Sequence, residues 1–204
     1  MRIVAINHVS LDGVMQAPGR PDEDTRGGFA HGGWAQPGRD RAMTEAIGER
    51  MGKPDGGMLL GRRSYEDMLA TWNDKGGPFK ESLNAITKYV VSNSFATQLE
   101  WPNSTLLHGD VPASVAELKR KPGGNLVIMG SGQLIRSLLP HELIDEYLLM
   151  IHPLLLSSGQ RLFDREDRVS KLRLLGSTAT PTGVIIATYS PRVARRIRDA
   201  GGAS

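Results

Sequence analysis

The fold of this chain is decided by two stretches, MLLGRRSYE at residues 58–66 and LVIMGSGQLI at residues 126–135. In each, a short apolar run ends at glycine and a helical pattern follows at once, which predicts a strand leading directly into a helix. A helix start exposes unpaired backbone N–H groups at the positive end of the dipole. Glycine lets a phosphate approach those groups closely. Two such junctions could hold a diphosphate-bearing cofactor, although each also fits an ordinary turn, and Ile135 replaces the third glycine of a standard Rossmann fingerprint.

The remaining pattern predicts an α/β fold with one domain. We expect strands at 3–9, 58–60, 85–92, 105–108, 126–129 and 143–151, a closing hairpin at 171–177 and 183–190, and helices at 40–51, 62–72, 112–121 and 131–139. Alternating strands and helices favour a mostly parallel sheet, and the final run of strands favours an antiparallel edge. Residues 10–38 are rich in Gly, Pro and Asp and predict a long functional loop. The domain should span 1–190, with 191–204 as a loose basic tail.

Composition restricts the class of protein. Of 204 residues, 39% are hydrophobic and 23% are charged, which suits a single packed core. The sequence shows no run of about 20 apolar residues and no signal-peptide layout, so we expect a cytoplasmic protein without a membrane span. Cys is absent and the histidines lack metal spacing, so no metal site is expected. The net charge of +3 comes largely from the tail, and aromatics are 5%, which disfavours nucleic-acid binding.

Four motifs in order resemble the dihydrofolate reductase-like superfamily. They are SLDGV at 10–14, GRRSYE at 61–66, GSG at 130–132, and the stretch from DEYL at 145–148 to GQRLF at 159–163. The closer match is the branch that contains the C-terminal reductase domain of the bacterial riboflavin-biosynthesis protein RibD. The resemblance implies a three-layer fold, a mostly parallel twisted sheet with an antiparallel C-terminal edge and helices on both faces. It also implies NADPH as the cofactor, lying along the carboxyl ends of the strands.

The resemblance carries cofactor-binding roles to eight positions. Backbone N–H groups of the glycine turn should meet the pyrophosphate, and Arg62 should lie beside cofactor phosphates, for which a guanidinium fork is well suited. Ser64 could bond the pyrophosphate or cap its helix, and the residues after the third strand could approach the 2′-phosphate or form a plain turn. The expected cofactor-binding residues are Gly61, Arg62, Ser64, Ser92, Asn93, Gly130, Ser131 and Gly132.

The substrate side is less defined by the sequence. Gln16 and Trp34 belong to the loop that closes over the nicotinamide in the family, and Asp12 either contacts substrate or belongs to an Asp-Gly turn. Folate reductases use a helix carboxylate to hold and protonate the pterin, and Glu45 stands about where that carboxylate belongs. A buried Glu45 could have a raised pKa and donate a proton, whereas a solvated Glu45 would have no catalytic role. Asp12 and Glu45 are thus the candidate catalytic residues.

These observations predict an NADPH-dependent reductase of a small nitrogen heterocycle or related compound. The closest named activity is reduction of 5-amino-6-(5-phosphoribosylamino)uracil in riboflavin biosynthesis. The alternatives are a dihydrofolate or pteridine reductase, and a non-enzymatic NADP-binding regulatory protein. No nucleic-acid or membrane partner is expected, and the branch implies a homodimer.

Overall fold

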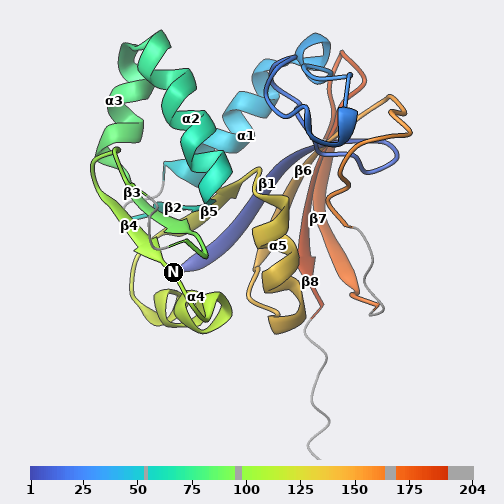
Figure 1. Ribbon diagram of the computed structural model, residues 1–204. Helices are drawn as coiled ribbons and strands as arrows, with labels where there is room; N and C mark the ends of the chain where they lie inside the picture. The colour runs from blue at the N-terminus through green and yellow to red at the C-terminus, as the bar shows by residue number, and fades with distance from the viewer. Residues whose placement is uncertain (53–54, 95–97, 164–168, 193–204) are drawn as a thin grey trace, which may run out of the picture.

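The computed structural model describes residues 1–52, 55–94, 98–163 and 169–192, which form one sheet with helices on both faces (Figure 1). The strands are β1 Arg2–Ser10, β2 Gly57–Gly61, β3 Thr87–Val91, β4 Ser104–Leu107, β5 Asn125–Met129, β6 Glu146–His152, β7 Leu172–Ala179 and β8 Ile185–Pro191. The α-helices are α1 Arg41–Met51, α2 Arg62–Lys75, α3 Gly77–Ala85, α4 Val111–Arg120 and α5 Gly132–Leu138. Short 3₁₀ turns occupy Arg26–Gly28, Gln36–Gly38 and Leu139–His141.

The eight strands lie in the order β4-β3-β2-β5-β1-β6-β8-β7. The first six of these pair in parallel, whereas β8 runs antiparallel to β6 and β7. This confirms the predicted parallel sheet with an antiparallel C-terminal edge. The predicted tail falls mostly outside the described residues, because the description ends at Arg192.

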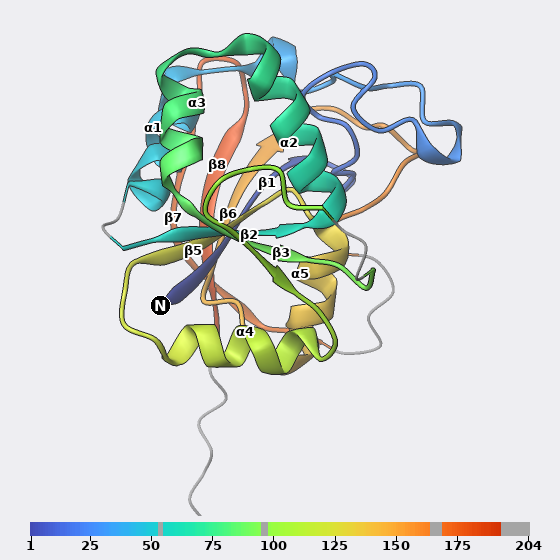
Figure 2. The same ribbon diagram turned by 60° about the vertical axis from the view of Figure 1, so that its left-hand side comes forward.

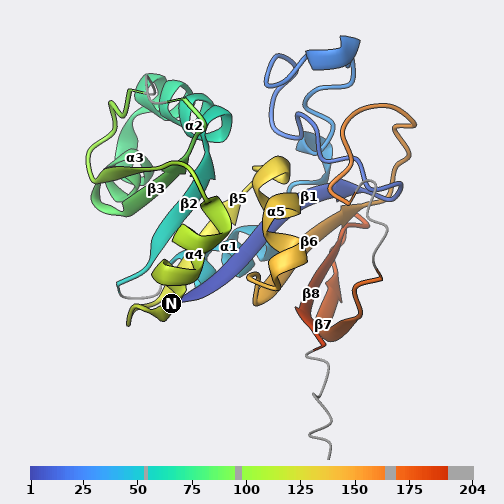
Figure 3. The same ribbon diagram turned by 60° about the horizontal axis from the view of Figure 1, so that its bottom comes forward.

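Period-two alternation in β1 divides the core between the two faces of the sheet. Ile3, Ala5 and Val9 pack with the apolar residues of α4 and α5. Val4 and Ile6 point the other way and pack with α1. Figure 3 shows α4 and α5 in front of the sheet with α1 behind it, and Figure 2 shows α1, α2 and α3 grouped together on the same side. The three-layer arrangement is therefore confirmed.

Local signals explain most helix boundaries. The Asp40 side chain accepts a hydrogen bond from the Ala42 N–H and caps α1, and Asp110 caps α4 through the Ala113 N–H. The apolar face expected for residues 40–51 is present, with Met43 buried and Ala42, Ala46, Ile47 and Met51 packed beside it. No helix was predicted from the sequence where α3 lies, although Pro78 fits the first turn of a helix.

Candidate active site

The carboxyl ends of β2 and β5 meet at a point where the chain turns to opposite faces of the sheet. The two strands are parallel neighbours, with Gly57 opposite Leu126 and Met58 opposite Val127. β2 continues into α2, which covers the same face as α1, and β5 continues into α5 on the other face. Open α/β sheets bind ligands at such a crevice. The two glycine junctions predicted from the sequence therefore lie side by side.

Ser131 joins the two junctions directly. Its hydroxyl oxygen accepts a hydrogen bond from the Gly61 N–H at 3.0 Å, and its hydroxyl donates to Ser64 Oγ at 2.9 Å. Ser131 has φ +52° and Gly130 has φ +67°, so the turn uses left-handed backbone twice in succession. Ser64 consequently bonds to the other junction, and it does not act as the N-cap of α2, a position that Gly61 occupies.

Asn7 lies beside this turn and was not identified from the sequence. Its side chain is 3% exposed and donates from Nδ2 to the Gly130 carbonyl oxygen at 3.1 Å. Because that carbonyl can only accept, the amide orientation is fixed and Oδ1 faces away from it. Among the described residues, Oδ1 has no hydrogen-bond partner. A buried acceptor without a partner costs free energy, and it is a common sign of a ligand-binding position.

Met15 covers the other side of the same turn. Its sulfur lies 4.0 Å from Asn7 Nδ2, and it occupies the space that a Cβ on Gly132 would need. Any side chain at position 132 would therefore require Met15 to move. A long flexible thioether can move away at little cost, so the surface formed by Gly130 and Gly132 can be uncovered for a ligand.

Arg62, Ser92 and Asn93 lie along the same edge, since Gly61 pairs with Val91 at the end of β3. Arg62 is exposed and forms an ion pair with Glu66 at 2.9 Å, one helical turn away. Ser92 is buried and its hydroxyl accepts from the Ser94 N–H, as in a serine turn, whereas Asn93 is exposed. The structure thus brings these residues beside the crevice, and their roles toward a cofactor remain predictions.

Asp12 holds two loops together. Its carboxylate accepts hydrogen bonds from the Ser10 hydroxyl at 2.6 Å and from the N–H groups of Leu156 and Ser157 at 3.2 and 2.9 Å. The Ser10 hydrogen bond, followed by those two backbone groups, lowers the pKa of Asp12 to about 2. A carboxylate in this setting is ionised at neutral pH and cannot serve as a proton donor there, so its geometry favours the turn interpretation.

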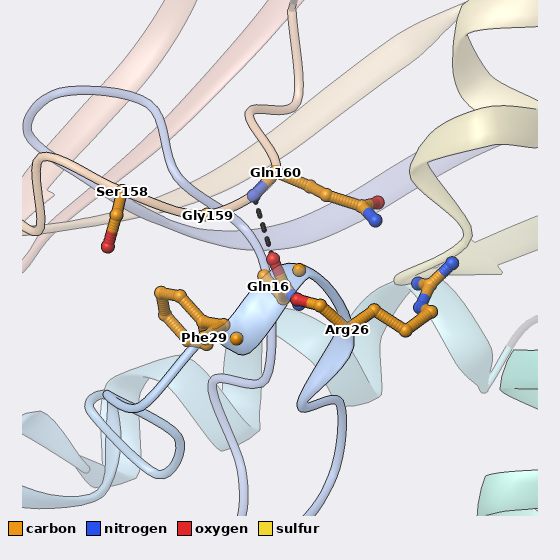
Figure 4. Close-up of a pocket in the computed structure, with 8 residues that line it drawn as sticks. Gln16, Arg26, Phe29, Ser158, Gly159 and Gln160 are labelled. Atoms are coloured by element: carbon orange, nitrogen blue, oxygen red, sulfur yellow. Dashed lines mark hydrogen bonds between the residues drawn. The ribbon is translucent and has the colours of Figure 1, made fainter.

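Gln16 and Trp34 organise the long loop. The buried Gln16 side chain donates to the carbonyl oxygens of Asp24 and Arg26 and accepts from the Gln160 N–H, and the Trp34 indole donates to the Gln16 carbonyl oxygen at 2.7 Å. Gln16, Arg26 and Gln160 line a cavity of about 260 Å³. Figure 4 shows Gln16 at its centre, with Phe29 and Ser158 on one side and Arg26 and Gln160 on the other. Gln16 therefore lines this cavity, whereas Trp34 packs against the small apolar cluster of the loop, formed by Val14, Ala17 and Phe29.

Arg20 fastens the same loop to α2. Its guanidinium bonds the Asp67 carboxylate at 2.5 Å and the Thr71 hydroxyl at 2.6 Å. Glu23 accepts from the Gly19 and Arg20 N–H groups, and burial raises the pKa of its carboxyl. The loop is thus tied both to α2 and, through Gln16 and Asp12, to residues 154–160.

Glu45 is not buried, contrary to the environment considered for it. Its side chain is 56% exposed and forms an i,i+4 ion pair with Arg41 at 2.7 Å. The apolar face of α1 is occupied by the residues that pack on β1 and β6, and Glu45 lies beside that face in solvent. The burial on which the proton-donor role depended is absent, and the structure favours the solvated interpretation.

A histidine pair that was not identified from the sequence lies on the α1 side of the sheet. His8 Nδ1 lies 2.9 Å from His152 Nε2, and the edge of the Trp34 ring packs on His152 with ring centroids 5.2 Å apart. Burial, followed by His152 and Arg39, lowers the pKa of His8 to about 4, and burial also lowers the pKa of His152. Both imidazoles are consequently neutral at pH 7.

In the part of the chain that the structure describes, no group of three potential metal ligands occurs, and no helix is long and apolar enough to cross a membrane.

Comparison with solved structures defines the class of fold. Similar structures include a protein ascribed to riboflavin biosynthesis from Shewanella sp. PV-4 (TM-score 0.68, 20% identity, 94% of this chain and 99% of that one). Dihydrofolate reductase from Enterococcus faecalis, in complex with NADP(H) and RAB-propyl, has a TM-score of 0.60 at 15% identity, covering 93% of this chain and 96% of that one. A pyrimidine reductase-like protein from Corynebacterium diphtheriae gives 0.62 at 14%, covering 94% and 92%. The chain therefore has the dihydrofolate reductase-like fold.

The family follows from sequence. The model of the RibD C-terminal domain matches residues 2–186, so the chain belongs to that family and is an oxidoreductase. Two uncharacterized Bacillus subtilis proteins are similar to it. YyaP is 33% identical over 139 residues, covering 65% of this chain and 72% of YyaP. YwjB is 28% identical over 120 residues, covering 59% of this chain and 65% of YwjB.

Proposed function

We propose that this reductase uses NADPH and binds the dinucleotide along the crevice between β2 and β5. The observation that supports this most strongly is the Ser131 bridge, which places two glycine-bounded helix starts beside one buried acceptor, Asn7 Oδ1. Each helix start offers backbone N–H groups to a diphosphate, and glycine leaves room for it. When bound, the cofactor supplies the hydride.

Each part of the dinucleotide has a counterpart in the chain. The backbone of Gly61 and of Gly130–Gly132, with the Ser64 hydroxyl, would hold the diphosphate. Arg62, Ser92 and Asn93 at the neighbouring edge would hold the adenosine ribose and its 2′-phosphate. Asn7 Oδ1 would accept a hydrogen bond from the nicotinamide carboxamide, which satisfies the buried oxygen and orients the ring.

The substrate we propose is a small nitrogen heterocycle, and a pyrimidine such as 5-amino-6-(5-phosphoribosylamino)uracil fits best. Support comes from family membership and from the names of the structural neighbours, which refer to riboflavin biosynthesis and to pyrimidine reduction. The chain would orient the substrate and exclude water with the loop fastened by Arg20, Gln16 and Asp12. We further propose a cytoplasmic homodimer, for which the exposed Leu174 and Leu175 on the edge strand β7 offer an apolar surface.

The experiment that tests this function compares NADPH with 2′,5′-ADP, which lacks the nicotinamide half. Calorimetric titration of wild type should show binding of both ligands. Asn7→Leu should weaken NADPH about 10-fold, the cost of one buried hydrogen bond, and leave 2′,5′-ADP unchanged. Thermal unfolding of the variant checks that the loss of its bond to Gly130 has not disrupted the sheet.

Turnover separates a reductase from a cofactor-binding regulator. The absorbance of reduced nicotinamide should fall when wild type is mixed with NADPH and a pyrimidine of this class. Tight NADPH binding without oxidation on any pyrimidine, pterin or quinone would favour the non-enzymatic alternative. Absence of NADPH binding would contradict the proposal.

A further inference from the structure

The His8–His152 pair terminates two apolar rows on the α1 face of the sheet. In β1, Val4, Ile6 and His8 share one face, and in β6 the same face carries Leu148, Met150 and His152. The apolar residues of both rows form the core under α1. The histidines replace them at the carboxyl ends of the strands, which is the edge that binds ligands in open α/β sheets.

The short contact between the two rings requires that one nitrogen donates and the other accepts. His152 is 1% exposed, and its Nδ1 lies close to Gly38. Two arrangements of the protons satisfy this contact. In one of them, His152 donates from Nε2 to His8 Nδ1, and His8 carries its own proton on Nε2.

His8 is partly exposed, so in that arrangement its Nε2–H is a donor at the carboxyl edge of the sheet. The titratable or charged groups that act on His8 are His152 from β6 and Arg39 from the loop before α1. A nearby carboxylate would raise the pKa of His8, yet burial, His152 and Arg39 all lower it. Glu45, the carboxylate on the adjacent helix, is paired with Arg41. This side of the site thus combines a neutral imidazole pair with the positive charge of Arg39 and, among the described residues, has no carboxylate that acts on His8.

We propose that His8 Nε2–H donates a hydrogen bond to a carbonyl oxygen of the substrate, and that His152 acts as the positioning residue that fixes the His8 tautomer. This assignment rests on the proposed reductase function and specifies its substrate class as a planar heterocycle with carbonyl acceptors along one edge. A ring that presents amino groups on that edge would bring donors against donors, and the site would reject it.

A matched pair of probes tests this directly. Pteridine-2,4-dione and pteridine-2,4-diamine share one ring system and differ in whether the edge carries carbonyl or amino groups. Calorimetry on wild type with NADP⁺ present should show tighter binding of the dione. His8→Phe, which keeps a ring and removes the donor, should weaken the dione about 3- to 10-fold and leave the diamine unchanged. Equal or tighter binding of the diamine to wild type would overturn the proposal.

Three further variants separate recognition from folding. His8→Gln restores an N–H near the position of Nε2 and should recover part of the dione affinity, and His152→Phe, which leaves the His8 tautomer unfixed, should lose an intermediate amount. His141→Phe alters an exposed histidine on the turn after α5 and should change nothing. Identical dione affinity in wild type and a folded His8→Phe would overturn the assignment.

The same variants distinguish this inference from the cofactor assignment. NADPH affinity should be unchanged in His8→Phe and in His152→Phe, because both side chains point away from Asn7. If wild type failed to bind NADPH, the cofactor proposal would fail. The probes, titrated without cofactor, would then still decide whether His8 recognises carbonyl groups.

Discussion

Asn7 and His8 are consecutive residues of β1, and their side chains enter opposite sides of the sheet. Asn7 faces the glycine turn, where backbone N–H groups, small residues and one fixed amide line the crevice. His8 faces the α1 side, where two imidazoles and an indole line the surface. One side is built mainly from backbone, so its specificity depends on space and conformation. The other is built from side chains, so its specificity depends on protonation state and on donor and acceptor pattern.

The largest effect should come from a side chain that fills the crevice on the Asn7 side of the sheet. Gly132→Val places branches where Met15 now lies, and the flexible Met15 can move, so the fold should persist. NADPH affinity should fall by about 100-fold or more, because the diphosphate loses both space and N–H contacts. Gly48→Ala in α1, where a Cβ meets nothing within 4 Å, is the matched control and should leave affinity unchanged. Normal NADPH binding by a folded Gly132→Val would show that the turn is only structural.

On the His8 side of the sheet, the largest measurable effect should be a loss of folding stability at acid pH. Folding lowers the pKa of His8 from 6.5 to about 4, so the unfolded chain takes up the proton first as pH falls. The free energy of unfolding should therefore decrease between about pH 6.5 and pH 4 by about 3 kcal/mol, and level off below. Urea unfolding at several pH values should show this slope in wild type and a shallower one in His8→Phe. A slope that is the same in both proteins would contradict the burial of His8.

Asp12 contributes in a separate pH window. Its pKa is also lowered, to about 2, but for a carboxyl group this means that stability is present above about pH 4 and is lost as pH falls toward 2. The two windows allow the histidine pair and the loop anchor to be measured in one titration series.

A smaller effect should come from replacing Arg62, at the edge of the crevice that we propose for the cofactor. Arg62 is 44% exposed and already paired with Glu66, so the gain from a 2′-phosphate is at the lower end for charged hydrogen bonds. Arg62→Ala should weaken NADPH about 10-fold and NADH much less, as measured by titration of both cofactors. The exposed neighbour Arg63→Ala provides the control. An equal loss for NADPH and NADH would assign Arg62 to the diphosphate instead.

The smallest effect should come from Glu45. Its replacement by Gln removes an exposed ion pair, so the free energy of unfolding should change by less than about 0.5 kcal/mol. Steady-state turnover on any accepted substrate should match wild type. A decrease of about 100-fold or more in kcat would restore Glu45 as the substrate acid and weaken the assignment of this side to the histidines.

The two sides also differ in how far the sequence predicts them. The glycine junctions are local patterns, so residues 58–66 and 126–135 could be recognised, and assigned to one ligand, from the amino-acid sequence alone. Asn7 was missed because a single polar residue in a buried strand has no local pattern, although its inward position was a usable signal. The histidine pair joins residues 144 positions apart, and only the register of β1 on β6 brings them together. Glu45 was considered as a buried acid because the spacing of residues along a helix does not show whether a residue beside the apolar face is buried or solvated.

The hydrogen bonds of Gln16 have a consequence for the timing of ligand exchange. The Gln16 side chain bonds to the backbone of Asp24, Arg26 and Gln160, and the Gln16 backbone carbonyl oxygen accepts from the Trp34 indole. Arg20 holds the same loop, residues 16–34, to α2. No part of this segment can leave without breaking several of these bonds at once, so it should open as a single cooperative unit. Its amide hydrogens should then be protected by one common free energy of opening, and the rate of that opening sets an upper limit on how fast a ligand covered by the loop can leave.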